Sequence, residues 1–202
     1  MKNIITILFA SIFLMSTANA GGMIGVKAGV GDLHGKRTSS VDAKGGASSA
    51  SVDSEYGAVF AEVNLADNIS VGLEVVPMSG IIDTKATTGT DSQVTVEDLK
   101  TLYFLASRDT DFGSVYGKIG YAHADLTVVA NYGQTITNAS DAAEGPMVGI
   151  GAQFSLPTPI IDTMRIEGTY TNFNELKITS DGDKRTGDAD LTTLSISLAR
   201  SF

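Results

Sequence analysis

The chain has 202 residues, with 14 Lys and Arg against 23 Asp and Glu, so its formal net charge at pH 7 is −9. An acidic chain is repelled by phosphate backbones, which argues against a nucleic-acid partner. It has no cysteine, which excludes a disulfide framework and a thiolate metal site. Hydrophobic residues make up 43% of the chain, and they are spread in alternation instead of being gathered into blocks.

The N-terminus has the pattern of a secretory signal peptide. Lys2 provides a positive charge, residues 4–15 form an apolar core, and Ala18-Asn19-Ala20 is a small-x-small cleavage site. The apolar run is shorter than the roughly 20 residues that a membrane-spanning helix needs. We therefore predict a signal peptide over residues 1–20, cleaved after Ala20, and one domain over residues 21–202. Loss of Lys2 leaves that domain with a net charge of −10.

Eight segments of about ten residues alternate apolar and polar side chains, as half-buried strands do. The first places Val26 and Val30 on one face and Lys27 on the other, and the last places Ile196 opposite Ser197. In chain order the predicted strands are residues 23–32, 55–66, 69–78, 97–108, 114–125, 146–156, 162–173 and 191–202.

The connections between these segments alternate in length. Short turns lie at residues 67–68, 109–111 and 157–159, and long polar connections cover residues 33–54, 79–96, 126–145 and 174–190. Short periplasmic turns and long extracellular loops produce this alternation in a bacterial outer-membrane barrel. The last strand ends on Phe202, without a tail, and such a barrel needs its final strand to pair with the first. We predict an all-β fold, an eight-stranded antiparallel up-and-down transmembrane β-barrel.

A soluble lipocalin-like binder is the alternative architecture, because it also has eight up-and-down strands and a signal peptide. Its apolar face would point inward around a ligand, and its charged face would point to water. The alternation of loop lengths and the aromatic terminus favour the membrane barrel, in which these faces are reversed.

Seven charged residues share the less apolar face of the predicted strands and are expected to point into the lumen. An eight-stranded barrel is just wide enough for side chains to fill it, and unpaired charge there would be costly. We therefore predict an ion-pair network that acts as a polar core, and a proton or ion path is the alternative. Five members fall at mid-height, with Arg165 below and Lys100 above; the predicted network is Lys27, Glu62, Glu74, Lys100, Lys118, Arg165 and Glu167.

Outward-facing aromatic residues near strand ends are expected to form the girdles of a membrane barrel. Arg200 has the same outward parity near the periplasmic end, where its side chain can extend to the interface. The predicted interface aromatics are Tyr103, Tyr121, Phe154, Tyr170 and Phe202.

Enzymatic and metal sites have little support in the sequence. His123 is expected to face outward near the extracellular headgroups, where some outer-membrane barrels hold the His and Ser of a lipid A-modifying site, but no serine follows two positions later. His34 lies at the base of the first long loop. The Asp-rich residues 180–190 do not match a calcium loop, because Arg185 occupies a ligand position. We predict no catalytic, metal or cofactor site.

Four stretches carry a resemblance to a known class of barrel: residues 115–122, the alternating glycines of 145–154, residues 165–170 and the terminal 198–202. On these residues the chain resembles the small outer-membrane β-barrel superfamily of the OmpA/OmpX type. The resemblance implies that Glu62, Glu74, Lys118, Arg165 and Glu167 fill the lumen. The chain lacks the peptidoglycan-binding domain and any tryptophan, so a cell-wall anchoring role is not supported and Tyr and Phe must form the girdles.

We expect a non-enzymatic outer-membrane protein with a role in envelope integrity or in surface contacts through its extracellular loops. The alternatives are a narrow pore or small-molecule conduit, a lipid-modifying enzyme, and a soluble lipocalin-like binder. The expected partners are outer-membrane lipid and lipopolysaccharide, the barrel-assembly machinery through the terminal strand ending in Phe202, and surface partners of the loops.

Overall fold

The computed structural model describes residues 21–39, 49–77, 80–85, 91–132, 135–180 and 183–202. The signal peptide predicted over residues 1–20, with its cleavage after Ala20, lies outside these residues. No helix of the described residues has the length and apolarity needed to cross a membrane.

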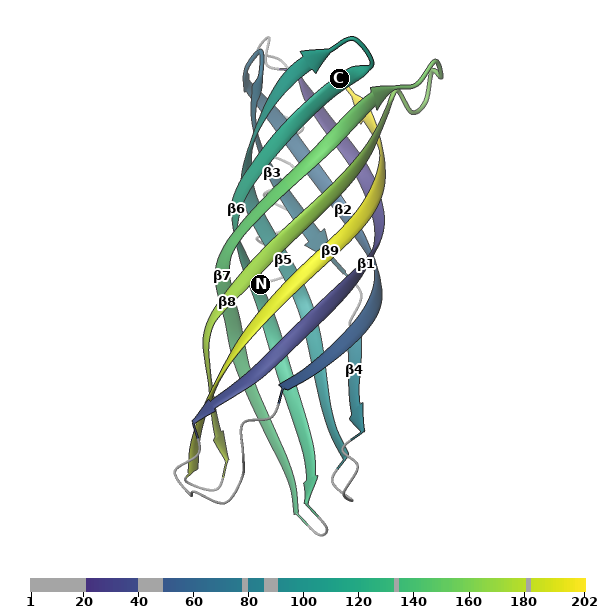
Figure 1. The fold of residues 1–202 in the computed structure, drawn as a ribbon. Coiled ribbons are helices and arrows are strands. Elements are labelled where there is room, and N and C mark those ends of the chain that lie inside the picture. Colours follow the sequence, from purple (N-terminus) through teal and green to yellow (C-terminus); the bar gives the residue numbers. More distant parts are fainter. Residues whose placement is uncertain (1–20, 40–48, 78–79, 86–90, 133–134, 181–182) are drawn as a thin grey trace, which may run out of the picture.

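The described chain folds into antiparallel strands that are joined by turns and wound into a barrel (Figure 1). The strand β4 continues β3 beyond a break at Pro77, and both pair with β5, so the wall consists of eight strands as predicted. The elements are β1 (Gly22–Ser39), β2 (Ser49–Ala66), β3 (Ile69–Val76), β4 (Gly80–Lys85), β5 (Asp91–Thr110), β6 (Gly113–Tyr132), β7 (Thr135–Ser155), β8 (Thr163–Ser180) and β9 (Asp183–Ser201).

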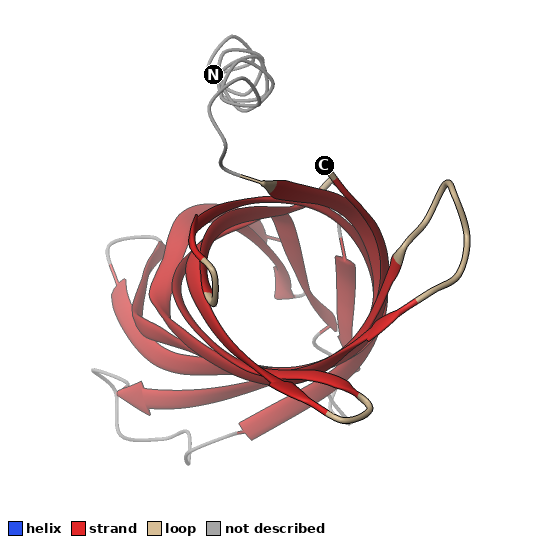
Figure 2. Ribbon diagram, turned by 90° about the horizontal axis from the view of Figure 1, so that it is seen from above, coloured by secondary structure: helices blue, strands red, loops and turns tan. Residues whose placement is uncertain are grey.

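The barrel closes because the first strand pairs with the last and β3 pairs with β5 (Figure 2). In the β1–β9 ladder Val26 lies opposite Leu198, and the backbones of Gly22 and Phe202 exchange two hydrogen bonds of 2.9 Å. Closure leaves no unpaired edge in this part of the wall, which a strand in hydrocarbon requires. We call the end that holds Gly22, Phe202 and the short connections the turn end, and the opposite end the loop end.

The two faces of the wall have opposite polarity. Outward apolar side chains are exposed, with Ile119 at 63% and Ile196 at 55%, whereas the inward Lys118 is 3% exposed. A lipocalin would show the reverse arrangement, so the structure contradicts the soluble alternative. The exposed apolar band is the surface that a barrel turns toward lipid.

The strands are much longer than predicted. Seven of the described strands span 18–21 residues, and the short β4 extends the line of β3 toward the loop end. The described residues of the polar connections 33–54, 79–96, 126–145 and 174–190 are therefore strand, and they extend the ladders toward the loop end. The sequence interpretation was wrong here because polar alternation was assigned to loops, although backbone hydrogen bonding does not need an apolar face in water.

Inward aromatic rings lie over glycines of the neighbouring strand. Phe60 is paired with Gly25 and Tyr103 with Gly72, and a Cβ added at these glycines would lie 2.5 Å from the Phe60 ring and 2.4 Å from the Tyr103 ring. The same arrangement joins Tyr116 to Gly151. An aromatic ring that covers a cross-strand glycine buries apolar area and shields the bare backbone, so each glycine leaves the space that the ring of its partner fills on the lumen face.

The faces of β5 are the reverse of those predicted. Leu102 and Phe104 face outward and are 56% and 51% exposed, whereas Tyr103 is 1% exposed. Tyr103 is therefore not a girdle residue, and Lys100, which shares the face of Leu102, is not a lumen residue. Both faces of this segment carry large apolar side chains, so alternation alone did not indicate the inward one, and the pairing of Tyr103 with Gly72 does.

Candidate functional site

The centre of the lumen holds two lysines and two glutamates from four different strands. The Nζ atom of Lys27 donates to Glu74 Oε2 at 2.5 Å and to Glu167 Oε1 at 2.6 Å. Lys118 Nζ donates to the same two oxygens at 3.1 and 3.2 Å. Each carboxylate oxygen thus bridges two ammonium groups, and the four side chains tie β1, β3, β6 and β8 together across the barrel.

A second ion pair lies beside the first. Arg165 donates from Nη1 and Nη2 to the two carboxylate oxygens of Glu62 at 2.6 and 2.8 Å, which is a bidentate pair. Its Nε donates to Gln153 Oε1 at 2.8 Å. The guanidinium carbon lies 5.6 Å from the ring centre of Phe60 and 5.2 Å from that of Tyr116, distances at which a cation is attracted to a ring face.

Two tyrosines connect the pairs. Tyr103 donates its hydroxyl to Glu62 at 2.8 Å, and Lys118 Nζ lies 3.8 Å from the centre of the Tyr103 ring. Tyr116 donates to Glu167 at 3.1 Å. The sequence placed Tyr103 in the girdle, and it placed Tyr116 on the same face as Lys118 without assigning it a role. The glycines opposite them were the available signal.

The central lumen cluster, as we call Lys27, Glu62, Glu74, Lys118, Arg165 and Glu167, is electrically balanced. It contains three cations and three carboxylates, and the side chains are 2–7% exposed except for Glu74 at 13%. Every charge is met by at least one opposite charge, which offsets the cost of burying it. The structure brings these six predicted residues together.

Lys100, the seventh predicted member, lies elsewhere. Its Nζ is 3.7 Å from Asp98 Oδ2, and its side chain is 30% exposed on the outer face. Asp98 has a positive φ of 54° at a shift in register between β5 and β6. The lysine therefore belongs to the outer surface beside this bulge.

Apolar side chains occupy the lumen on both sides of the central lumen cluster. Toward the turn end, Met23, Phe60 and Ala199 pack together. Toward the loop end, Phe173 packs with Ala122, Ala143 and Ala189, and partly buried leucines cover them; these are Leu33, Leu99 and Leu191. The interior is thus a layered core in which a polar layer lies between apolar ones.

The other predicted girdle residues have outward positions. Tyr121 and Tyr170 are 48% and 42% exposed, and Phe202 is 51% exposed beside the last strand. Phe154 packs against the exposed Phe112 of the neighbouring turn, with ring centres 6.4 Å apart. Sequence reasoning did not include Phe112, which contributes to the same edge of the apolar band.

His123 lies on the outer face, as expected from its parity, but near the middle of β6. Its Nδ1 is 2.8 Å from Glu144 Oε1 and its Nε2 is 3.6 Å from Asp125 Oδ1. Acyl-ester hydrolysis would need a nucleophile beside such a pair, and among the side chains that the structure describes no serine contacts His123. His34 is exposed on β1.

Asp162 forms hydrogen bonds to the end of the final strand, β9, at the turn end. Its carboxylate accepts hydrogen bonds from the backbone and hydroxyl of Ser201 at 3.1 Å and lies 3.4 Å from Arg200. Partial desolvation acts to raise the pKa of Asp162, but the hydrogen bonds from Thr163 and Ser201 and the charge of Arg200 outweigh it and hold the pKa below its usual value. Arg200 is thus partnered by a residue that sequence reasoning did not single out.

The described residues contain no group of three or more His, Asp or Glu side chains placed to hold a metal ion. No known protein-family model matches the chain, and no curated protein matches it in sequence.

Solved structures do match. OprG, an outer-membrane protein of Pseudomonas aeruginosa, aligns with a TM-score of 0.56 and 13% identity over 90% of this chain and 96% of its own. The outer-membrane protein AlkL, solved in lipid bilayers, aligns with a TM-score of 0.56 and 16% identity over 91% of each chain. Ail, the attachment invasion locus protein of Yersinia pestis, was solved in a complex with the heparin analogue sucrose octasulfate. It aligns with a TM-score of 0.51 and 13% identity over 89% of this chain and 99% of its own. The chain therefore has the fold of small outer-membrane barrels, in agreement with the resemblance drawn from its sequence.

Proposed function

We propose that the chain is exported, cleaved after Ala20 and inserted in the bacterial outer membrane as a closed, non-enzymatic barrel. It supports the integrity of the envelope and presents its long strands at the cell surface. The proposal includes outer-membrane lipid and lipopolysaccharide as its surroundings, and assembly of the barrel through the terminal strand that ends in Phe202.

The central lumen cluster carries this proposal. Six charged side chains from five strands meet within hydrogen-bonding distance, closer to the turn end than to the loop end, and apolar layers lie on both sides of them. Steady conduction needs a continuous hydrated path, and a balanced, buried network offers permeating ions no unpaired charge. The cluster therefore favours the interpretation as a sealed structural core and argues against an ion path.

Conductance in planar lipid bilayers tests the proposal. We expect the folded mature chain, after insertion shown by heat-modifiable migration on a gel, to give no steady open channel. A stable single-channel current from the same preparation would overturn it. Loss of envelope integrity in cells that lack the gene, restored by the wild-type gene, is the matching expectation in vivo.

The charge of the loop end bears on the kind of surface partner. Across residues 33–54, 79–96, 126–145 and 174–190, acidic side chains outnumber basic ones by 11 to 7. Such a surface favours partners that are not polyanions. The sulfated ligand of the Ail complex is thus a poor guide to a partner of this chain.

A small-molecule conduit is the second candidate, and one observation favours it. In the described residues β2 pairs with β3 only from Val59 onward, and no ladder joins the rest of β2 to β4. There β2 and β4 lie side by side without a backbone ladder in the described residues, so the hydrogen bonding of the wall, and not the wall itself, is interrupted between β2 and the segment that follows Pro77. Saturable uptake of small apolar solutes into cells or vesicles, without ion conductance, would favour this candidate over a purely structural role.

A further inference from the structure

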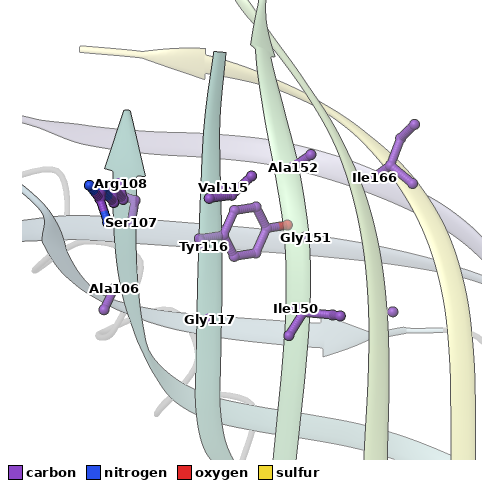
Figure 3. A pocket seen from close by; sticks show the side chains of 11 residues that line it. Ala106, Ser107, Arg108, Val115, Tyr116, Gly117, Ile150, Gly151, Ala152 and Ile166 are labelled. Atoms are coloured by element: carbon purple, nitrogen blue, oxygen red, sulfur yellow. The ribbon is translucent and has the colours of Figure 1, made fainter. Parts of the chain in front are cut away.

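A groove runs across the outer face of β5, β6, β7 and β8 near the turn end (Figure 3). Its volume is about 700 Å³. Most of its lining residues belong to the outward face and are exposed or half-buried, so the groove opens where the apolar band faces the membrane. The outward lining residues that matter here are Ala106, Arg108, Gly117, Ile150, Ala152 and Gly168.

Two glycines create the hollows of this groove. Gly117 and Gly168 are the cross-strand partners of Ile150 on its two sides. A Cβ at Gly117 would meet no heavy atom within 4 Å, and one at Gly168 would meet only a backbone oxygen at 3.8 Å. Ile150 consequently projects as a ridge between two hollows and is 75% exposed, more than its strand neighbour Val148 at 53%.

The wall under the groove is closed from the lumen side. The Tyr116 ring lies over Gly151, so closely that a Cβ there would lie 2.3 Å from the ring (Figure 3). The groove is thus separate from the central lumen cluster, although Tyr116 contacts both.

Arg108 supplies a charge at one edge of the groove. It lies two residues before β5 ends at Thr110, is exposed on the outer face, and makes no ion pair with any residue that the structure describes. Phe112 and Phe154 pack together at the same end of the barrel, which is the depth where aromatic residues meet lipid headgroups. The cation lies at the depth of the lipid phosphate, and the apolar hollow extends toward the bilayer centre as an acyl chain does. The two features therefore match the headgroup and the tail of one lipid molecule.

We infer that this groove binds a phospholipid of the periplasmic leaflet. Its phosphodiester is held by Arg108, and one acyl chain lies in the hollows beside Ile150. Guanidinium groups bind phosphate through charge-assisted hydrogen bonds, and an acyl chain can contact bare backbone only where side chains are as small as those of Gly117 and Gly168. The inference rests on the membrane location in the proposed function.

Native mass spectrometry of the full mature chain, folded in detergent with phosphatidylethanolamine and phosphatidylglycerol, tests the site. Gly117→Leu fills a hollow that has free space, and we expect it to abolish retention of one lipid during stepwise delipidation. Arg108→Gln should weaken retention roughly tenfold, the size of one hydrogen bond to a charged group. Gly57→Leu is the matched control, because Gly57 is an outward glycine of β2 with similar free space.

The outcomes separate the site from the fold. Heat-modifiable migration shows that each variant is folded, and retention of the lipid by Gly57→Leu but not by Gly117→Leu supports the site. Equal retention by Gly117→Leu and wild type would overturn it. So would a wild-type dimer that Gly117→Leu dissociates without changing lipid retention, because the groove would then hold a second copy of the chain. Failure of the wild type to insert into lipid would instead overturn the proposed function, and the site with it.

Discussion

Each charged residue of the central lumen cluster forms at least two polar contacts with its neighbours. Glu62 accepts two hydrogen bonds from Arg165 and one from Tyr103, and Lys27 is shared between two glutamates. A buried pair of this kind contributes little net stability compared with well-packed apolar residues, but removal of one partner leaves an uncompensated charge. The central lumen cluster therefore specifies one arrangement of the strands more than it strengthens the fold.

Glu62→Gln tests the cost of breaking that balance. The substitution keeps the shape of the side chain but leaves the Arg165 guanidinium buried without its carboxylate, so we expect the free energy of unfolding to fall by about 3–5 kcal/mol. Denaturant titration of the barrel in lipid vesicles gives this value. Glu55→Gln in the same strand, at an exposed position, should change it by less than about 0.5 kcal/mol. Equal effects of the two substitutions would contradict the role given to the buried pair.

Gly151 and Gly117 form a matched pair of residues on adjacent strands. A Cβ at Gly151 would lie 2.3 Å from the Tyr116 ring and 2.8 Å from the Ile166 carbonyl oxygen, whereas one at Gly117 would meet nothing within 4 Å. We expect Gly151→Ala to destabilise the barrel by about 1–3 kcal/mol through overpacking, and Gly117→Ala to leave it as stable as the wild type or slightly more stable. The same denaturant titration measures both, and a tolerated Gly151→Ala would show that the ring does not depend on this glycine.

At the scale of the element, the last strand depends on a side chain from the preceding turn. Because the pKa of Asp162 is lowered, its stabilising contribution is complete above the ordinary pKa of an aspartate and is lost as the pH falls through the lowered value. We expect the Ser201 amide, which donates to this carboxylate, to lose hydrogen-exchange protection on acidification in that range. Asp162→Ala should remove the protection at neutral pH and make it insensitive to acid. Unchanged protection in this variant would show that ladder pairing alone holds the strand end.

The sequence predicted the centres and order of the strands because alternation is strong where one face meets lipid. The segment around Ile119, with Lys118 on its other face, is an example. The prediction from sequence failed where the two faces of a strand do not differ clearly in polarity. Several strand ends at the loop end have few apolar residues, as in residues 49–54 and 183–190. In β5 both faces carry large apolar residues, so Tyr103 and Lys100 were assigned to the wrong sides. The partners Tyr116, Gln153 and Asp162 were missed because their roles depend on which strand lies beside which.

At the scale of the whole molecule, the barrel reverses the usual distribution of polarity. Charged residues from distant strands form the interior polar layer, and apolar side chains such as Ile119, Ile150 and Ile196 cover the outside. Such an arrangement is stable only when the outer band is removed from water. The direction in which each side chain points is therefore the property that distinguishes a membrane barrel from a soluble one.

The chain contains no tryptophan, so a single introduced tryptophan reports the surroundings of one position. We expect the fluorescence of Ile119→Trp, on the outer face, to be strongly quenched when the barrel is folded into vesicles of lipids brominated along their acyl chains. Phe60→Trp, 3% exposed in the lumen, should be quenched far less, because the wall and the packed interior separate it from the bromine atoms. Heat-modifiable migration confirms that both variants are folded. Equal quenching at the two positions would mean that lipid reaches the interior, and stronger quenching of the lumen probe would reverse the assignment of the two faces.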